Sequence, residues 1–454
     1  MKCLIEFLGD NKQEEIRNRC QLQSDTYEET LENYRDAFLA EIRIIKSWPC
    51  NNNKDIINRS RKENNKEKKE LLSHCKDECS EYEKSEYIDR IYDVIKKIGN
   101  EEIESFFNKI IKVYINWING NGSKSLKDLS ILLGKKKVLK FKQDISNTIL
   151  FRGRISDSIL SPWDMFHIPF NKRYLILNQR YSLTGQPLLY LGMSVFDIMN
   201  ELNISEENIE KVNISTFDFK EEFEVYDLTN PFYKYFNEGK MQISEMIDYE
   251  IEDDIIKSEF FKFILSSICK FKRRVISSNH AFYEEYVIPQ LLAQIVKSKG
   301  LKGILYSSTN IRDKATIYNT TYKNNLAIFT NFNRHNEEKH VYDKKLYDKI
   351  LISKPFNFKD IKNKEIKIED IEYICSMLDI ISKDKGSKYF KYTSLQYRLK
   401  DDFEILKVYE KDDIDKSKLN EINYFDSKIG KFHLYLIYSL VIQRRDECFA
   451  GGEK

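Results

Sequence analysis

The sequence predicts an α+β protein in which helical segments flank a central region of short strands. Apolar residues recur at three- and four-residue steps through most of residues 1–144. Five of the seven prolines lie between Pro162 and Pro289, where short β-rich runs also appear. From about residue 356 the pattern is again mostly helical. We therefore expect three domains, at 1–144, 145–355 and 356–454.

The first domain is predicted to be a helical bundle. Thr26–Trp48 places apolar residues on one stripe, and Tyr87–Ile98 and Ile103–Ile118 show the same periodicity. Gly99-Asn100 separates the last two helices because both residues tolerate a left-handed backbone. This region contains no evident reactive group.

The central domain is predicted to combine strands with one clear helix. The helix follows Pro289 and stops at Gly300. Residues 203–282 are acidic and aromatic, and we interpret them as a mostly helical insertion. The expected strands are Thr148–Ile155, Leu188–Leu191, Phe223–Leu228, Gly303–Tyr306 and Leu326–Phe329.

The C-terminal region is predicted to be mixed but mostly helical. Ile366–Ile381 has helical spacing. Phe432–Ile442 is strongly apolar but shorter than the roughly 18 residues that span a membrane. We expect it to be a buried element, and we expect no membrane segment.

The amino-acid composition limits the kinds of partner and the cellular compartment that we expect. The chain has 74 Lys and Arg against 72 Asp and Glu, a net charge of +2, which argues against a broad nucleic-acid surface. Its eight cysteines are scattered and no secretion signal is evident, so we expect a cytoplasmic protein with reduced thiols. His74, Cys75 and Cys79 have no second ligand pair, so we expect no metal site.

Polar residues with binding chemistry gather between residues 150 and 201. Arg152 and Arg154 share one face of a predicted strand, where a guanidinium can hold a phosphate or form a structural ion pair. Arg180 and Tyr181 precede a turn at Gly185 and the next strand.

Three further side chains have both a binding and a structural interpretation. Tyr190 is either a core aromatic or a platform on which a heterocycle stacks. Glu201 ends an apolar helix, where a carboxylate is usually solvated. Ser307 and Ser308 follow a strand, where hydroxyls often cap turns.

Taken in order, these pieces resemble the RES domain family over roughly residues 148–335. "LFRGR" is similar to the opening strand with its arginine, Arg152, and "QRYSLTGQPLLYLG" to the second arginine, Gly turn and strand. "SVFDIMNE" is similar to the helix with the glutamate, Glu201. "VIPQLLAQIVKSKGLKGILYSST" and "NLAIF" resemble the closing helix and strands, with Ser308 as the serine and Ser307 as the fallback.

Two features depart from the family pattern. The insertion between Glu201 and Ser308 is longer than in minimal RES toxins, and both flanking regions are additional. The N-terminal region is similar in placement to the HEPN-like domain that precedes some RES domains.

The resemblance implies an ADP-ribosyltransferase-like fold that cleaves the nicotinamide–ribose bond of NAD without a metal. Arg152, Glu201 and Ser308 would be catalytic. Binding residues would be Arg152, Arg180, Tyr181, Tyr190 and Ser308. It also implies a bacterial toxin or phage-defence effector, with an Xre-type antitoxin or another regulatory protein as partner.

The sequence leaves the acceptor open between water, phosphate and a protein side chain, so the chain could be an NAD glycohydrolase, a phosphorylase or an ADP-ribosyltransferase. The oligomeric state is also open. A HEPN-type RNase is a further alternative. Arg334–His340 has the motif spacing, but it follows a predicted strand in a polar loop, and we interpret this match as chance. A non-catalytic interaction protein is the last alternative.

Overall fold

The computed structural model describes residues 4–47, 86–146, 148–204, 206–232, 252–274, 282–309, 324–333, 341–361, 366–384, 407–411 and 419–450. The chain forms two compact units. The helical unit contains residues 1–141, 179–181 and 228–298, and the sheet unit contains residues 142–178, 182–227 and 299–454. Helices and a mixed sheet are both present, which confirms the α+β fold class.

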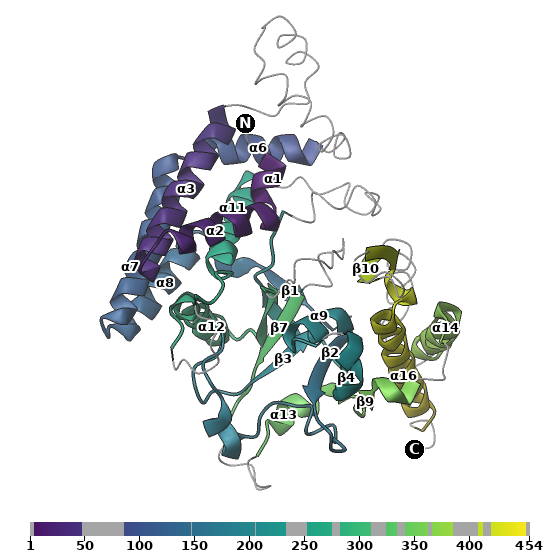
Figure 1. The fold of residues 1–454 in the computed structure, drawn as a ribbon. Helices are drawn as coiled ribbons and strands as arrows, with labels where there is room; N and C mark the ends of the chain where they lie inside the picture. Colours follow the sequence, from purple (N-terminus) through teal and green to yellow (C-terminus); the bar gives the residue numbers. More distant parts are fainter. Residues whose placement is uncertain are drawn as a thin grey trace, which may run out of the picture. The chain divides into compact units, whose positions relative to one another are not determined.

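The described residues of the helical unit form α-helices and short 3-10 turns (Figure 1). The helices predicted near Thr26–Trp48, Tyr87–Ile98 and Ile103–Ile118 are confirmed, with slightly different ends. Gly300 has a φ of +81° just beyond the helix that it was predicted to end. The α-helices are α1 (Leu4–Leu8), α2 (Asp10–Leu22), α3 (Tyr27–Ser47), α6 (Glu86–Lys97), α7 (Asn100–Ile118), α8 (Gly122–Lys135), α11 (Asp253–Ile268) and α12 (Val287–Ser298).

Aromatic rings form the core of the helical unit around Phe38 of α3. The ring of Phe38 lies 4.8 Å from that of Phe7 and 5.3 Å from that of Phe107. Tyr34, one turn earlier, is fully buried and donates a 2.6 Å hydrogen bond to Gln13. The apolar stripe predicted for this helix is therefore its buried face.

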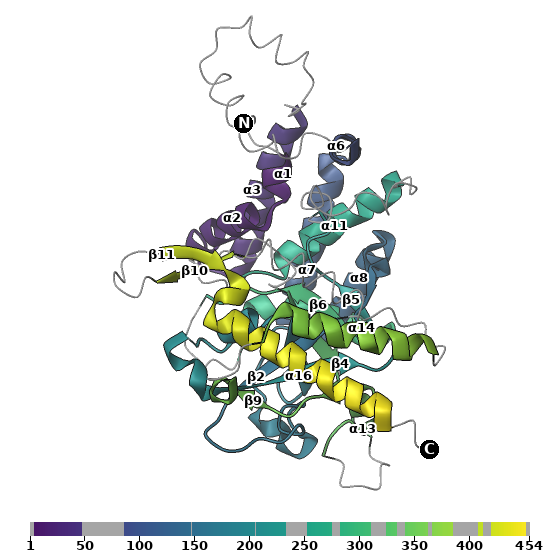
Figure 2. The same cartoon turned by 90° about the vertical axis from the view of Figure 1, so that its right-hand side faces the viewer.

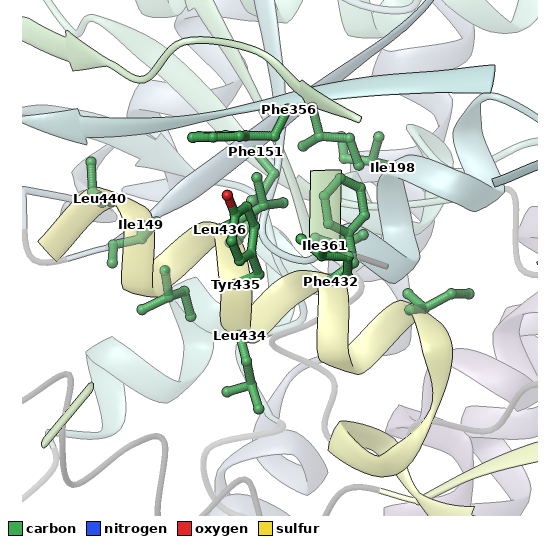
Figure 3. Close-up of a cluster of buried hydrophobic side chains, with 14 of the residues drawn as sticks. Ile149, Phe151, Ile198, Phe356, Ile361, Phe432, Leu434, Tyr435, Leu436 and Leu440 are labelled. Carbon is green, nitrogen blue, oxygen red and sulfur yellow. The ribbon is translucent and has the colours of Figure 1, made fainter. Parts of the chain in front are cut away.

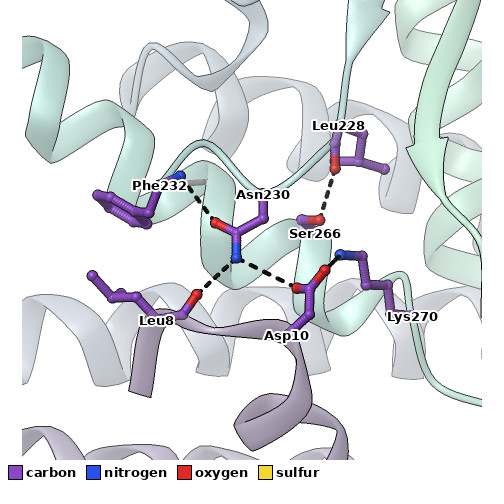
Figure 4. Close-up of polar contacts among 7 residues, drawn as sticks. All are labelled: Leu8, Asp10, Leu228, Asn230, Phe232, Ser266 and Lys270. Carbon is purple, nitrogen blue, oxygen red and sulfur yellow. Dashed lines mark hydrogen bonds and ion pairs between the residues drawn. The ribbon is translucent and has the colours of Figure 1, made fainter. Parts of the chain in front are cut away.

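Polar contacts fix residues 228–232 to the helical unit (Figure 4). Asn230 donates to the carbonyl of Leu8 at 2.7 Å, and Ser266 of α11 donates to the carbonyl of Leu228 at 2.7 Å. Lys270 forms a 2.8 Å ion pair with Asp10. These contacts explain why the predicted insertion divides at residue 228, with its later part joining the N-terminal helices.

In the sheet unit, nine strands of the described residues form one mixed sheet in the order β1-β5-β6-β7-β3-β2-β4-β8, with β9 also pairing with β4. β5 and β6 are parallel, and the other described pairs are antiparallel. The strands are β1 (Lys142–Asp144), β2 (Leu150–Ile155), β3 (Leu188–Gly192), β4 (Val212–Phe219), β5 (Glu224–Asp227), β6 (Gly303–Ser307), β7 (Asn324–Phe329), β8 (Ile350–Ile352) and β9 (Phe356–Asn357).

Strand β4 was not predicted and lies inside the segment that we interpreted as a mostly helical insertion. It pairs with β2 at six consecutive positions, from Val212↔Ile155 to Phe217↔Leu150. Its run VNISTFDF is almost continuously buried, including Ser215, Thr216 and Asp218. The alternation of apolar and polar residues in this run changes phase between Ser215 and Thr216, so neither face of the strand is uniformly apolar in sequence, although both are buried.

Helices of the sheet unit cover one face of the sheet, which we call the helix face. Phe151 of β2 packs there with α9 (Val195–Glu201) and α16 (Lys428–Ala450) (Figure 3). Helix α14 (Ile368–Asp384) belongs to the same buried cluster. Figure 2 shows α14 and α16 side by side. The residues from 356 onward thus belong to the core of the sheet unit instead of forming a separate domain.

Loops cover the opposite face, which we call the loop face. Leu150 of β2 and Leu189 and Leu191 of β3 pack there with Met165 and Phe166. A short helix, α13 (Lys344–Tyr347), also contributes Leu346. The alternation of side chains along each strand therefore assigns every strand residue to one of these two faces.

The C-terminal helix is tied to the sheet by a buried ion pair. Nε and Nη2 of Arg444 on α16 lie 2.8 and 2.7 Å from Oδ2 of Asp218 on β4, whose side chain is 1% exposed. A hairpin of β10 (Lys407–Lys411) and β11 (Leu419–Asn423) precedes this helix.

We expect Arg444→Met to lower the free energy of unfolding by about 3 kcal/mol, because it leaves the Asp218 carboxylate buried without its cation. Arg445→Met should change it by less than about 0.5 kcal/mol, since Arg445 pairs with Asp446 near the surface. Urea unfolding measures both. Equal effects of the two substitutions would contradict a special role for the buried pair.

Candidate active site

Glu201 is positioned by the short helix α9. Ser194 begins this helix by accepting a hydrogen bond from the backbone N–H of Asp197 at 3.0 Å. Val195, Ile198 and Met199 are buried on the helix face of the sheet. Glu201 is the last residue of the helix and is exposed, so its carboxylate extends beyond the apolar contact.

Ser308 meets Glu201 although 107 residues separate them. Its Oγ donates a 2.7 Å hydrogen bond to Oε1 of Glu201. Ser308 is 6% exposed and directly follows β6. Ser307 is on the loop face by alternation from Leu305. Of the two candidate serines, Ser308 is therefore the one that the structure brings to the glutamate.

Asn325 is a third member of this cluster that sequence analysis did not single out. Its Nδ2 donates to the same Oε1 of Glu201 at 2.9 Å, and the residue is 5% exposed. The available signal was weak, because Asn324 and Asn325 together begin the strand NNLAIF and only its remaining four residues are apolar. We had interpreted that run as a closing strand only.

Gly192 gives the Asn325 amide its space. The two residues are paired across β3 and β7. A Cβ at position 192 would lie 3.3 Å from Oδ1 of Asn325, 3.3 Å from Oδ2 of Asp197 and 2.9 Å from Cδ1 of Ile198. A larger residue at 192 would therefore push on both the amide and α9.

Tyr190 lies on the helix face, two residues before Gly192 on β3, because its neighbours Leu189 and Leu191 pack on the loop face. It is half-buried and is paired with Ala327 of β7. The structure thus places Tyr190, Asn325 and Ser308 along one face of three adjacent strands.

Arg152 lies on the other face of the sheet. Leu150 packs on the loop face and Phe151 on the helix face, so Arg152 and Arg154 both point to the loop face. β2 and β3 pair at one described position, Phe151↔Gly192, whereas β2 pairs with β4 along its length. The structure does not bring Arg152 beside Glu201 on one face.

The Arg152 guanidinium is a buried cation. The residue as a whole is half-buried, but its Nη1 is buried and has no hydrogen-bond partner among the described residues. Burial, together with the charge of neighbouring Arg154, lowers the pKa of Arg152 to about 9. Burial also lowers the pKa of Arg154, while the Asp164 carboxylate opposes this shift. A bound anion would relieve this concentration of positive charge.

Arg180 and Tyr181 belong to the helical unit. Nη1 of Arg180 donates to the carbonyls of Cys269 and Phe271, at 2.6 and 3.0 Å, and the guanidinium lies 4.9 Å from the ring centroid of Tyr286. Cys269 caps the C-terminus of α11, where a cation is favoured by the helix dipole. Tyr181 is buried.

His167 is a neutral ring near Arg152. The backbone N–H of Asp343 donates to its Nε2 at 2.9 Å, so its Nδ1 carries the proton and donates to the carbonyl of Ile168 at 2.7 Å. Burial lowers the pKa of His167 to about 4, and the Arg152 charge contributes in the same direction.

Two predictions fall outside the described residues. His74, Cys75 and Cys79, which were weighed as metal ligands, lie there, as does Arg334–His340, the RNase-like spacing. Across the residues that the structure describes, no group of three or more His, Cys, Asp and Glu side chains is arranged to hold a metal ion. Within the same residues, no helix is both long and apolar enough to cross a membrane.

Comparison with known proteins identifies a sequence relative that matches part of the chain. No protein-family model matches the chain. A curated protein named "Putative toxin YopC", from Bacillus subtilis (strain 168), is 34% identical over 185 residues. This match covers 39% of the present chain and 40% of that protein, so the chain spans about two-fifths of its relative.

Among solved structures, a chain from the crystal structure of the M. tuberculosis MbcT-MbcA toxin-antitoxin complex aligns with a TM-score of 0.25 and 12% identity. The alignment covers 49% of the present chain and 90% of that chain. A TM-score of 0.25 is too low to assign a fold.

We expect His167 to make stability fall in mild acid. The unfolded ring takes up a proton near its ordinary pKa of 6.5, whereas the folded ring stays neutral until about pH 4. Protonation therefore favours the unfolded state, and stability is lost as the pH falls from 6.5 to 4. Relative to His167→Gln, the parent should lose about 3 kcal/mol over this interval. Urea unfolding at several pH values measures it, and parallel curves would contradict it.

Proposed function

We propose that this chain cleaves the bond between nicotinamide and ribose in NAD and acts as a toxin. The observation that carries the proposal is the 2.7 Å hydrogen bond from Ser308 to Glu201. It joins a hydroxyl and a carboxylate from elements that are distant in sequence. These are the two residues that the RES resemblance identified beside the arginine.

The chemistry of the bond suits a carboxylate without a metal. Departure of nicotinamide leaves positive charge on the ribose, as in glycoside hydrolysis. Glu201 would stabilise that charge or orient a ribose hydroxyl, and Ser308 would hold the carboxylate or the sugar. Nicotinamide leaves as a neutral molecule, so no cation is needed to stabilise the leaving group.

Arg152 would hold the pyrophosphate of NAD. Its buried guanidinium and the neighbouring Arg154 supply the positive charge that a phosphate would neutralise. Arg152 and Glu201 lie on opposite faces of the sheet. The proposal therefore requires a bound NAD molecule to contact residues from both faces. β2, which carries Arg152, and β3, which carries Tyr190, are adjacent in the sheet and pair at Phe151↔Gly192.

The remaining binding residues have roles in the same proposal. Tyr190 would form a wall against the nicotinamide ring, from the face that also presents Asn325. The resemblance also assigns NAD binding to Arg180 and Tyr181. Arg180 would then have to exchange a backbone carbonyl for a phosphate oxygen.

The toxin part of the proposal is supported by the relative from Bacillus subtilis, which is named a toxin and matches two-fifths of this chain. A toxin that depletes NAD would have to be restrained in its own cell, so we propose an Xre-type antitoxin or another regulatory protein as partner. The acceptor is water or phosphate in this proposal. Transfer to a protein side chain is the alternative that the same geometry allows.

We expect the parent protein to release nicotinamide from NAD. Glu201→Gln, which keeps the shape and removes the charge, and Arg152→Met should each lower kcat/KM by about a hundredfold or more, through loss of contacts to the transition state. Nicotinamide release is followed by chromatography, with and without phosphate and with a protein acceptor. The products then identify the acceptor as water, phosphate or protein.

Controls must exclude unfolding and inhibition by a partner. Each variant should match the parent in circular dichroism, and the parent should be prepared both alone and after expression with its genomic neighbours. Intact NAD in every preparation, with degradation of added RNA, would overturn the proposal in favour of the RNase alternative.

Ser308 and Ser307 provide a matched pair for the serine. Ser308→Ala should lower kcat by about tenfold or more, because Glu201 loses a hydrogen bond to its charged group. Ser307→Ala removes the hydroxyl of the preceding residue, which lies on the loop face, and should leave kcat within about threefold of the parent. The reverse order of the two effects would assign the role to Ser307.

A further inference from the structure

We infer that Asn325 is a positioning residue that holds the Glu201 carboxylate for the reaction. The inference rests on the proposed function, and it adds a residue that the resemblance did not supply. Its basis is the 2.9 Å hydrogen bond from Nδ2 of Asn325 to Oε1 of Glu201, the same oxygen that Ser308 contacts.

Glu201 needs such support because of where it lies. It is the last residue of a seven-residue helix and is exposed, so its long side chain has many rotamers available in solution. One hydrogen bond leaves the carboxylate able to swing about the shared oxygen. Two donors from adjacent strands fix that oxygen in space, as a reacting group requires.

Asn325 is a buried amide that adjoins the apolar part of its strand. Leu326, Ala327 and Ile328 follow it and are buried apolar residues. Burying an amide among them costs free energy unless its hydrogen bonds are made. The donor is directed to Glu201, and Gly192 opposite provides the space that the amide occupies.

Several polar groups share the helix face with Asn325. Asp197 and Glu201 come from α9, and Tyr306 and Ser308 come from the end of β6. Tyr190 on β3 completes the set. Two carboxylates are therefore close to the amide, so replacing its NH2 with an oxygen would place a third negative group among them.

The test uses Asn325→Asp, which keeps the shape and removes the donor. At pH 8 we expect kcat for NAD cleavage to fall about tenfold to hundredfold, with KM within about threefold of the parent. At pH 5.5 much of the loss should be recovered, because a proton shared by two neighbouring carboxylates restores a donor. A residue that only fills space would not show this pH dependence.

Asn324→Asp is the matched control. It is the same substitution one residue earlier on β7, on the opposite face by alternation. It should leave kcat within about threefold and show no recovery in acid. Asn325→Ala in a Glu201→Gln background should add less than about threefold to the loss, since the two residues act as one unit.

A stability measurement separates failure of this inference from failure of the proposed function. In urea, Asn325→Asp should be less stable than the parent at pH 8 and regain stability at pH 5.5, and Glu201→Gln should abolish that pH dependence. Absence of this coupling, or an active parent whose kcat survives Asn325→Asp, would overturn the inference. An inactive parent would overturn the proposed function, and the urea measurement would still decide whether Asn325 holds Glu201.

Discussion

The two hydrogen bonds that converge on Oε1 of Glu201 are the constraint around which the site is built. Ser308 and Asn325 donate them from the ends of two neighbouring strands, at 2.7 and 2.9 Å. The acceptor arrives on a short helix whose own apolar face is buried against the sheet. A carboxylate held in this way loses its freedom before a substrate binds, which is how a protein pre-organises a charged group.

That arrangement depends on the C-terminal part of the chain. The helix that carries Glu201 shares its buried cluster with α16, and Phe151 lies edge-on, 4.6 Å from the ring of His433. The Arg444–Asp218 pair fixes the same long helix to β4. Residues beyond 356 therefore stabilise the helix that carries Glu201 by packing against its buried side, although they contribute none of the candidate site residues.

The two faces of the sheet carry different kinds of polar side chain. Carboxylates, amide and hydroxyl gather on the helix face, whereas Arg152 and Arg154 supply positive charge on the loop face beside a neutral His167. Burial of an arginine without a hydrogen-bond partner on Nη1 is unfavourable for folding alone. In the proposed function the pyrophosphate of NAD neutralises this charge. The two sets of groups are nearest in the sheet order at the adjacent strands β2 and β3.

The sequence by itself predicted three helices within the first 140 residues and several strands of the sheet, because periodicity reports local structure. The association of Glu201 with Ser308 was expected only from the RES resemblance, since the two residues are 107 positions apart. Tertiary structure decided the rest. β4 was missed because both of its faces mix apolar and polar residues, and Asn325 because an amide at the start of a strand has no pattern of its own. The division at residue 228 was missed because contacts such as Asn230 to Leu8 join residues more than 200 positions apart. The side of the sheet that Arg152 occupies also followed from pairing register, since a shift of one residue moves a side chain to the other face.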